Sequence, residues 1–168
     1  MQRAIRSGEI LSLRDDLRCV QAYLSIEQAR LGERLKVTWS GVVTEPQQLQ
    51  ELDCALLDLR VPTLSVQPIV ENAVVHGISK KAEGGTVRIT VDRAGRDLVI
   101  QVEDDGVGIE PARRAAILKP PVEGDTSIGV RNVDGRLQAL YGTADGLDIK
   151  SAVGRGTRVQ IRIPVERS

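Results

Sequence analysis

The sequence predicts an α/β sandwich in which one mixed, mostly antiparallel sheet carries helices on one face. Three observations predict this class. A charged amphipathic pattern opens the chain, an apolar helical stretch lies near its middle, and two pairs of alternating segments are each joined by a short turn. With 168 residues, the chain is long enough for one domain with a sizeable core.

The composition excludes several classes of protein. Acidic and basic residues balance at 23 each and aromatic residues make up only 2%, so we expect no nucleic-acid partner. Cys19 and Cys54 lie far apart without a CxxC spacing, which argues against a disulfide framework or a zinc site and favours a cytoplasmic location. No apolar run approaches the length of a transmembrane helix. The chain is also compatible with the soluble end of a longer membrane protein.

The first third of the chain contains one predicted helix and one predicted strand. Apolar residues recur at three- and four-residue spacing over Leu13–Leu35, which predicts an amphipathic helix with a bend near Gly32. Alternation over Lys36–Val43 predicts a strand. We interpret the polar and then leucine-rich stretch Thr44–Arg60 as a turn followed by a short helix or an irregular segment.

A helix and a hairpin are predicted next. The apolar stretch Pro62–Ile78 predicts a helix that either starts or bends at Pro68, because proline lacks the amide hydrogen that a helix interior needs. Two alternating segments, Thr86–Asp92 and Asp97–Glu103, are separated by four residues and predict a β-hairpin.

The last third is predicted to contain a loop, a helix and a second hairpin. Gly106–Gly129 is rich in glycine and proline and predicts a mostly irregular loop, of a length that is usually functional. Val130–Tyr141 has the pattern of a helix. Leu147–Ser151 and Thr157–Pro164 predict the final hairpin.

The first chemical motif is QPIVENAVVHG, in which an apolar helix carries Glu71, Asn72 and His76. Asn72 and His76 are four residues apart and therefore share one helix face. Burying such groups without partners costs a few kcal/mol, so we expect them to meet something polar. The alternative is a helix end whose polar groups face water or its own cap, with His76 closing the C-terminus.

The second motif, VEDDGVGI, places Asp104 at the end of a strand and follows it with Gly106 and Gly108. Glycines there allow a sharp turn and the close approach of a ligand, and the carboxylate can accept a hydrogen bond from an exocyclic amine such as that of adenine. An ordinary Asp-Asp-Gly turn is the alternative.

Two further motifs follow along the chain. SIGVRN contains Gly129, Arg131 and Asn132 at the start of a helix, where free backbone amides can bind phosphate; a plain N-cap at Ser127 is the alternative. GRGT ends in Thr157 and leads into the last strand, and by itself it is also consistent with a simple hairpin turn.

In this order the four motifs resemble the N box and the three G boxes of the Bergerat-fold ATPases, the superfamily of DNA gyrase, the ninety-kilodalton heat-shock chaperone, histidine kinases and MutL. A narrower resemblance is to the sensor histidine kinases that pair with LytTR-type response regulators. It rests on the quoted motifs, on IGVRNVDGRL, and on LRDDLRCVQAYLSIEQARLGERL, which is similar to the helix after the phosphoacceptor segment. The resemblance implies a helical segment at 1–35 that follows a missing phosphoacceptor region, and an ATP-binding catalytic domain at 36–168.

The resemblance implies a function and a set of site residues. The domain is expected to bind ATP with Mg²⁺ and to transfer the γ-phosphoryl group to a histidine on a separate domain. Asn72 matches the asparagine that helps to ligate Mg²⁺, and Asp104 matches the aspartate that binds the adenine amine. Gly106 and Gly108 are expected to shape the floor of the nucleotide site, and Thr157 to support the adenine pocket through Asp104.

The remaining expected site residues lie around the phosphates. Glu71 and His76 join Asn72 in the catalytic set, although Glu71 points about 100° away from Asn72 on the helix. Gly129, with Arg131 and Asn132, is expected in the phosphate-facing turn of a lid. The implied partners are the phosphoacceptor histidine domain of the same protein and a response regulator of the LytTR type, with a homodimer in the full-length kinase. The implied location is the cytoplasm, at the cytoplasmic end of a membrane-bound sensor.

Two departures from the family pattern keep an alternative open. Val75 stands where this family often has a lysine that touches the phosphates, and Ser127 stands where a first lid glycine is usual. Both favour a non-catalytic, nucleotide-sensing regulatory module. A clamp ATPase of the gyrase or MutL kind is disfavoured, because Pro68 occupies the position of the glutamate that activates water in those enzymes.

Overall fold

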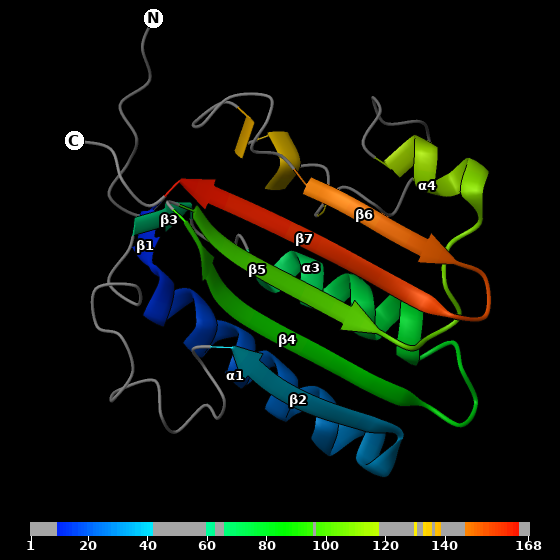
Figure 1. Ribbon diagram of the computed structural model, residues 1–168. Helices are drawn as coiled ribbons and strands as arrows, with labels where there is room; N and C mark the ends of the chain where they lie inside the picture. Colours follow the sequence, from blue (N-terminus) through cyan, green and yellow to red (C-terminus); the bar gives the residue numbers. More distant parts are fainter. Residues whose placement is uncertain are drawn as a thin grey trace, which may run out of the picture.

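The fold is built around one five-stranded sheet with helices behind it (Figure 1). The computed structural model describes residues 10–41, 60–62, 66–95, 97–117, 130, 133–135, 137–138 and 147–164. In spatial order the sheet consists of β2 (Leu35–Gly41), β4 (Gly85–Ala94), β5 (Asp97–Asp104), β7 (Gly156–Pro164) and β6 (Leu147–Ala152).

The sheet is mixed and mostly antiparallel, as predicted. β2 pairs with β4 in parallel, whereas the β4–β5, β5–β7 and β7–β6 pairs are antiparallel. Both predicted hairpins are confirmed, since β4 and β5 pair directly with each other and so do β6 and β7. A separate two-stranded ladder joins β1 (Ile10–Ser12) to β3 (Arg60–Pro62).

The first helix, α1 (Leu13–Leu31), follows β1 directly. Ser12 caps it, because its Oγ accepts a hydrogen bond from the Asp15 amide at 3.2 Å. The helix ends at Gly32, whose φ of 60° is easily reached only by glycine, and a 3₁₀ turn η1 (Gly32–Arg34) leads into β2. The predicted bend near Gly32 is therefore the end of the α-helix.

The second helix carries the first chemical motif. Of the predicted stretch Pro62–Ile78, the helical part is α3 (Gln67–Asn72) and its continuation η3 (Ala73–Ile78), which has π-helical hydrogen bonding. Pro68 lies in the first turn, where its missing amide hydrogen costs nothing, so the proline marks the start of the helix, one residue after Gln67. A carboxylate oxygen of the buried Asp16 on α1 accepts the amide hydrogen of Val66 at 3.1 Å and fixes this start.

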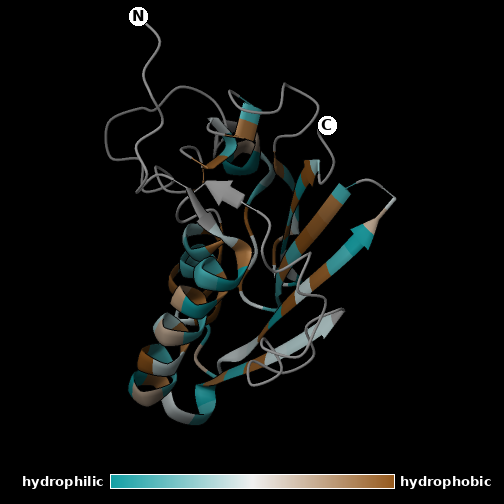
Figure 2. Cartoon of the chain, turned by 90° about the vertical axis from the view of Figure 1, so that its left-hand side faces the viewer, coloured by the Kyte–Doolittle hydropathy of each residue, from teal (hydrophilic) through white to brown (hydrophobic). Residues whose placement is uncertain are grey.

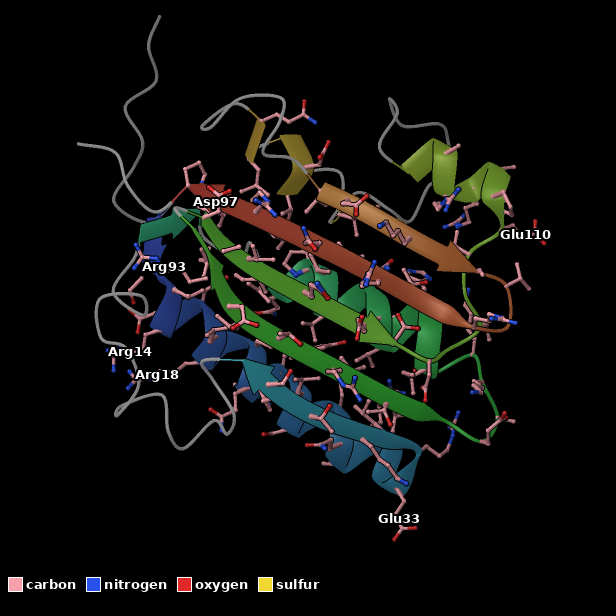
Figure 3. The ribbon with its side chains drawn as sticks, in the orientation of Figure 1. Arg14, Arg18, Glu33, Arg93, Asp97 and Glu110 are labelled. Atoms are coloured by element: carbon pink, nitrogen blue, oxygen red, sulfur yellow. The ribbon has the colours of Figure 1, made fainter. Side chains whose placement is uncertain are left out.

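The core lies between the sheet and these helices. Figure 2 shows the helices and the sheet as two layers, with α1 and α3 on the same side. Side chains alternate along β4, β5 and β7, so that one face of the sheet is buried and aliphatic while the other is polar. On the polar face, Arg162 of β7 pairs with Asp97 at 2.8 Å (Figure 3). The buried strand residues are Val87, Ile89, Val91, Leu98, Ile100, Val102, Val159, Ile161 and Ile163.

The loop predicted at Gly106–Gly129 contains a helix that the sequence analysis missed. This helix, α4 (Pro111–Ile117), starts at a proline and is preceded by Glu110, whose carbonyl accepts the Arg114 amide at 2.9 Å. Glycine and proline content alone therefore overstated the irregular part. Within the predicted helix Val130–Tyr141, the residues that the structure describes are helical.

Other predictions fall outside the described residues. These are the predicted turn and short helix of 44–59, the end of the strand predicted to reach Val43, and the part of the predicted loop beyond Ile117. Among the described segments, no helix has both the length and the apolar character needed to cross a membrane.

Candidate functional site

Three segments that are distant in the sequence converge at the C-terminal end of β5. They are the end of η3, the loop after Asp104, and the turn between β6 and β7. The amide of Val107 donates to the carbonyl of Gly77 at 3.4 Å, and the amide of Gly154 donates to the carbonyl of Val107 at 2.8 Å. The loop after Asp104 is thus held between the first motif and the last one.

Glycine is required where these backbones meet. A Cβ atom at Gly106 would lie 2.3 Å from the carbonyl carbon of Gly77. A Cβ atom at Gly156, whose φ is 97°, would lie 1.9 Å from the carbonyl oxygen of Asp104. Atoms at these distances overlap, so no larger residue fits without moving the backbone. A Cβ atom at Gly108 would likewise lie 2.1 Å from the carbonyl oxygen of Ala152.

Asp104 is a buried acid at the centre of this junction. Asp104 is only 8% exposed, and its Oδ1 accepts the amide hydrogen of Gly106 at 2.9 Å. Burial raises the pKa of Asp104 from 3.8 to about 6; hydrogen bonds from the backbone of Gly106 and Thr157 act in the opposite direction, and the neighbouring Asp105 carboxylate adds to the rise. The protein therefore holds a desolvated carboxylate whose remaining acceptor capacity suits a neutral hydrogen-bond donor.

The junction also brings Asp104 to the helix of the first motif. A Cβ atom at Gly77 would lie 2.5 Å from Asp104 Oδ1, so the end of η3 and the carboxylate are in direct contact. Gly77 directly follows His76. The structure thus joins the first and second motifs, whose contacting residues Gly77 and Asp104 are 27 positions apart in the sequence.

Thr157 lies opposite Asp104 in the β5–β7 register and is buried. Its hydroxyl pairs with that of Ser151 at 2.8 Å. Ser151 Oγ also accepts the amide hydrogen of Ile109 at 2.8 Å and donates to the carbonyl of Gly156 at 2.9 Å. The sequence analysis missed Ser151. The pattern that could have identified it is a hydroxyl residue at an inward position of β6, after the apolar inward residues Leu147 and Ile149.

Asn72 and His76 lie on the same helix, and both are partly buried. Burial lowers the pKa of His76, and the positive charges of Lys80 and of Arg113 on α4 lower it further. Those two cations therefore lie close enough to His76 to act on it electrostatically. Sequence analysis did not single out either of them, and it could not have placed Arg113 because α4 itself was not predicted.

Glu71 lies on the side of the helix that faces α1. Its Oε1 accepts a hydrogen bond from Gln67 Nε2 at 3.0 Å. The pKa of Tyr23 on α1 is raised to about 12, first by burial, then by Glu27 and by Glu71. The structure therefore brings Glu71 towards Tyr23 on α1.

Gly129, Arg131 and Asn132, which the sequence analysis assigned to the lid, lie outside the described residues, as does Ser127. The helix that follows them is anchored at its described residues. Asp134 is buried and accepts the amide hydrogen of Leu147 at 2.9 Å, which ties this helix to the start of β6.

Comparisons with known proteins agree on one family. The profile of the family described as "Histidine kinase-, DNA gyrase B-, and HSP90-like ATPase" matches residues 62–167. The chain is 36% identical over 158 residues to YwpD of Bacillus subtilis, an uncharacterized protein. The matched region covers 94% of this chain and 51% of YwpD. It is 33% identical over 159 residues to the sensor histidine kinase BtsS of Escherichia coli, covering 95% of this chain and 25% of BtsS. LytS of Enterococcus faecalis is 31% identical over 154 residues, covering 90% and 24%.

Solved structures share the fold. The histidine kinase domain of the blue-light activated histidine kinase from Erythrobacter litoralis has a TM-score of 0.60 and 25% identity, with 98% of this chain and 66% of that chain covered. The catalytic domain of the histidine kinase ThkA has a TM-score of 0.62 at 15% identity, covering 92% and 93%. The chain spans about half the length of YwpD and about a quarter of the length of the sensor kinases. The chain therefore belongs to the family of histidine kinase-, DNA gyrase B- and HSP90-like ATPases, and within it to the catalytic ATPase domains of sensor histidine kinases.

Proposed function

We propose that this domain binds ATP with Mg²⁺ at the junction around Asp104 and delivers the γ-phosphoryl group to a histidine on a separate domain. The observation that carries the proposal is the buried Asp104 carboxylate, held by the Gly106 amide at 2.9 Å and touched by the end of the helix that bears Asn72 and His76. It supplies an acceptor in an apolar environment at the meeting point of three family motifs. A purine amine is a donor of the matching kind.

Selectivity for adenine follows from the chemistry of that acceptor. Adenine presents an amine where guanine presents a carbonyl, and a carboxylate facing a carbonyl would leave two acceptors opposed. A site built to bond one polar group rejects an analogue that lacks it by several kcal/mol, since the buried group is left unpaired. Thr157, opposite Asp104 and bonded to Ser151, keeps the carboxylate in place from the neighbouring strand.

The phosphates are assigned to the helix side of the junction. Asn72 is proposed to ligate Mg²⁺, which commonly takes few protein ligands and completes its shell with phosphate oxygens and water. His76 lies one turn further along, beside Lys80 and Arg113. Val75, which is 44% exposed, stands where the family often has a lysine that touches the phosphates. We assign that positive charge to Lys80 and Arg113 instead. Gly129, Arg131 and Asn132 complete the proposal on the lid side.

Glu71 takes a positioning part in this proposal. Because its carboxylate accepts from Gln67 and acts on Tyr23, it connects the helix of Asn72 to α1. In related kinases the segment similar to α1 follows the phosphoacceptor helix, so such a contact suits the transmission of movement between the two parts.

In the transfer step the protein's task is mainly positioning and charge neutralisation. A nitrogen of the acceptor imidazole forms a bond to the γ-phosphorus while the bond to the β–γ bridging oxygen breaks, and ADP leaves with the electron pair. His76, the one histidine of the sequence, lies on the same helix as Asn72 and is not proposed as the acceptor. This function implies three partners: the acceptor domain, a response regulator of the LytTR type, and a second copy of the full-length kinase in a homodimer. It also implies that the domain works in the cytoplasm.

Titration calorimetry with ATP and GTP tests the nucleotide assignment. Wild-type protein should bind ATP in a Mg²⁺-dependent manner and GTP far more weakly, and Asp104→Ala should lose most of the ATP affinity. Asp92→Ala, which removes an exposed aspartate of β4, serves as the matched control and should bind ATP as the wild type does. Equal ATP affinity of wild type and Asp104→Ala would contradict the adenine assignment.

Phosphotransfer is tested with γ-labelled ATP. The isolated chain should acquire no acid-labile, alkali-stable label, and label should appear on a histidine-bearing helix of a related sensor kinase added in trans. Label on this chain that disappears in His76→Gln would refute the proposed geometry. ATP binding without transfer to any added helix would favour the alternative, a nucleotide-sensing module. The presence of Val75 in place of a lysine supports that alternative.

A further inference from the structure

A cavity opens on the polar face of the sheet, away from α1 and α3. It has a volume of about 810 Å³. Its walls come mainly from outward positions of β4, β5, β6 and β7, with Arg114 on α4 and Arg155 in the last turn. This volume lies within the range of small-molecule sites.

A row of charges crosses the sheet along one wall of this cavity. The strand registers put Arg88 opposite Glu103, Glu103 opposite Arg158, and Arg158 opposite Lys150. Neighbouring strands are about 4.8 Å apart, so the row is roughly 14 Å long. All four side chains line the cavity.

The last pair in this row is unfavourable by itself. Arg158 and Lys150 carry the same charge at directly opposed positions of an antiparallel pair, an arrangement that destabilises a sheet. Each has one long ion pair with an acid, Arg158 with Glu103 at 3.8 Å and Lys150 with Asp148 at 3.9 Å. Such half-exposed pairs contribute little, so they do not remove the repulsion.

The acids of the cavity wall are already engaged by the protein. Glu103 pairs with Arg158, Asp105 accepts the Thr86 amide hydrogen at 2.7 Å, and Asp104 accepts that of Gly106 at 2.9 Å. Against these three acids stand five cations contributed by four different elements and a turn. The cations are Arg88, Arg114, Lys150, Arg155 and Arg158. The wall therefore has an excess of positive charge.

This cavity differs from the part of the nucleotide site that is assigned to Mg²⁺ and the phosphates, around Asn72 and His76. Neither of these residues lines it. Asp104 and Thr157 do line it, but they occupy inward positions of their strands, whereas Glu103 and Arg158 occupy the adjacent outward positions. The two sites would thus share the strand backbone and lie on opposite faces of the sheet.

We propose that this cavity binds a linear oligophosphate or a comparable small polyanion, with its charges placed against the five cations of the wall. A single anion at the Arg158–Lys150 end would cancel the repulsion there but would not reach Arg88. An extended polyanion reaches the whole row, and the arginine forks match phosphate oxygens in paired hydrogen bonds. The site is separate from the proposed function, because it uses none of the side chains assigned to Mg²⁺ or to the phosphates of ATP.

Titration calorimetry with sodium tripolyphosphate, without Mg²⁺ and at low salt, tests the proposal. Wild type should bind one equivalent, and Lys150→Gln/Arg158→Gln should bind at least tenfold more weakly. The control Arg18→Gln/Arg30→Gln changes the net charge equally on α1 and should bind as the wild type does. Asn72→Ala should also keep its affinity, which separates this site from the nucleotide site.

A stability measurement gives a second readout that does not depend on the ligand. Lys150→Gln removes the like-charged pair, so its urea midpoint should be higher than that of the wild type without tripolyphosphate, and the order should reverse when the anion is added. Three outcomes overturn the proposal: equal losses of affinity in both double variants, loss of binding in Asn72→Ala, or equally tight binding of a hexaglutamate peptide, which would assign the row to an acidic protein segment.

Discussion

Asp104→Asn should uncouple the stability of this protein from pH over one defined range. In the folded protein, burial raises the pKa of Asp104 from 3.8 to about 6, against the opposing hydrogen bonds of Gly106 and Thr157. The charged carboxylate is therefore less favourable in the folded state than in the unfolded one. Asparagine has nearly the same shape and cannot ionise, so it removes this pH-dependent cost and leaves the packing in place.

The sign and size of the effect follow from linkage. Between the unfolded and the folded pKa, the folded state binds more protons, so the contribution of Asp104 to stability falls as pH rises from about 4 to about 6 and then stays constant. A rise of about two pKa units at about 1.4 kcal/mol per unit corresponds to about 3 kcal/mol. Relative to wild type, the variant should thus gain about 3 kcal/mol between pH 4 and pH 7.

Urea denaturation of both proteins at half-unit pH intervals measures this difference. Carboxylates remote from Asp104 contribute equally in both proteins and cancel. A constant offset is expected, because the asparagine NH₂ group would oppose the Thr157 amide, but an offset does not change with pH. A difference in unfolding free energy that is flat between pH 4 and pH 7 would refute the raised pKa of Asp104. Calorimetry adds a functional readout: if ionised Asp104 accepts the adenine amine, ATP should bind about tenfold more weakly at pH 5 than at pH 7.5.

Three further predictions concern the junction and its support. Gly106→Ala should lower the free energy of unfolding by about 1–3 kcal/mol or more, since its Cβ would lie 2.3 Å from the Gly77 carbonyl carbon. The control Gly135→Ala, with open space around it, should be neutral or stabilising by up to about 1 kcal/mol in the same urea titration. Ser151→Ala should cost about 1–3 kcal/mol, because it leaves the Ile109 amide without its acceptor, and Ser25→Ala, an exposed serine, is its control. Asp16→Ala removes the carboxylate that accepts the Val66 amide, so it should cost a similar amount and increase hydrogen exchange at the start of α3; unchanged exchange there would contradict the capping role.

Most of the secondary structure was predictable because the relevant forces are local. The alternation of β4, β5 and β7 reports a sheet with one buried face, and the proline and glycine at the ends of the first two helices act within one turn. The missed helix α4 shows the limit of composition. Pro111 there starts a helix rather than preventing one, a distinction that depends on position in the helix and not on residue content.

The candidate site was predictable as a set of motifs but not as an arrangement. Asn72, His76 and Asp104 stood out because polar residues interrupt apolar elements. Their contact through Gly77, the hydroxyl pair of Ser151 with Thr157, and the approach of Arg113 to His76 depend on segments separated by many residues. The direction of Glu71 towards α1 also depends on the neighbouring helix, because the helix period gives only its angle to Asn72.

By itself the sequence determined the periodicities, the positions of the caps and the order of the motifs, since each depends on residues within a few positions of one another. The tertiary structure alone decided which backbones meet, and that in turn set the burial of Asp104, its pKa of about 6 and the facing of Arg158 with Lys150. Burial and cross-strand register arise from distant pairings whose energies no local pattern contains. The physical chemistry of the site is therefore a property of strand pairing as much as of the residues themselves.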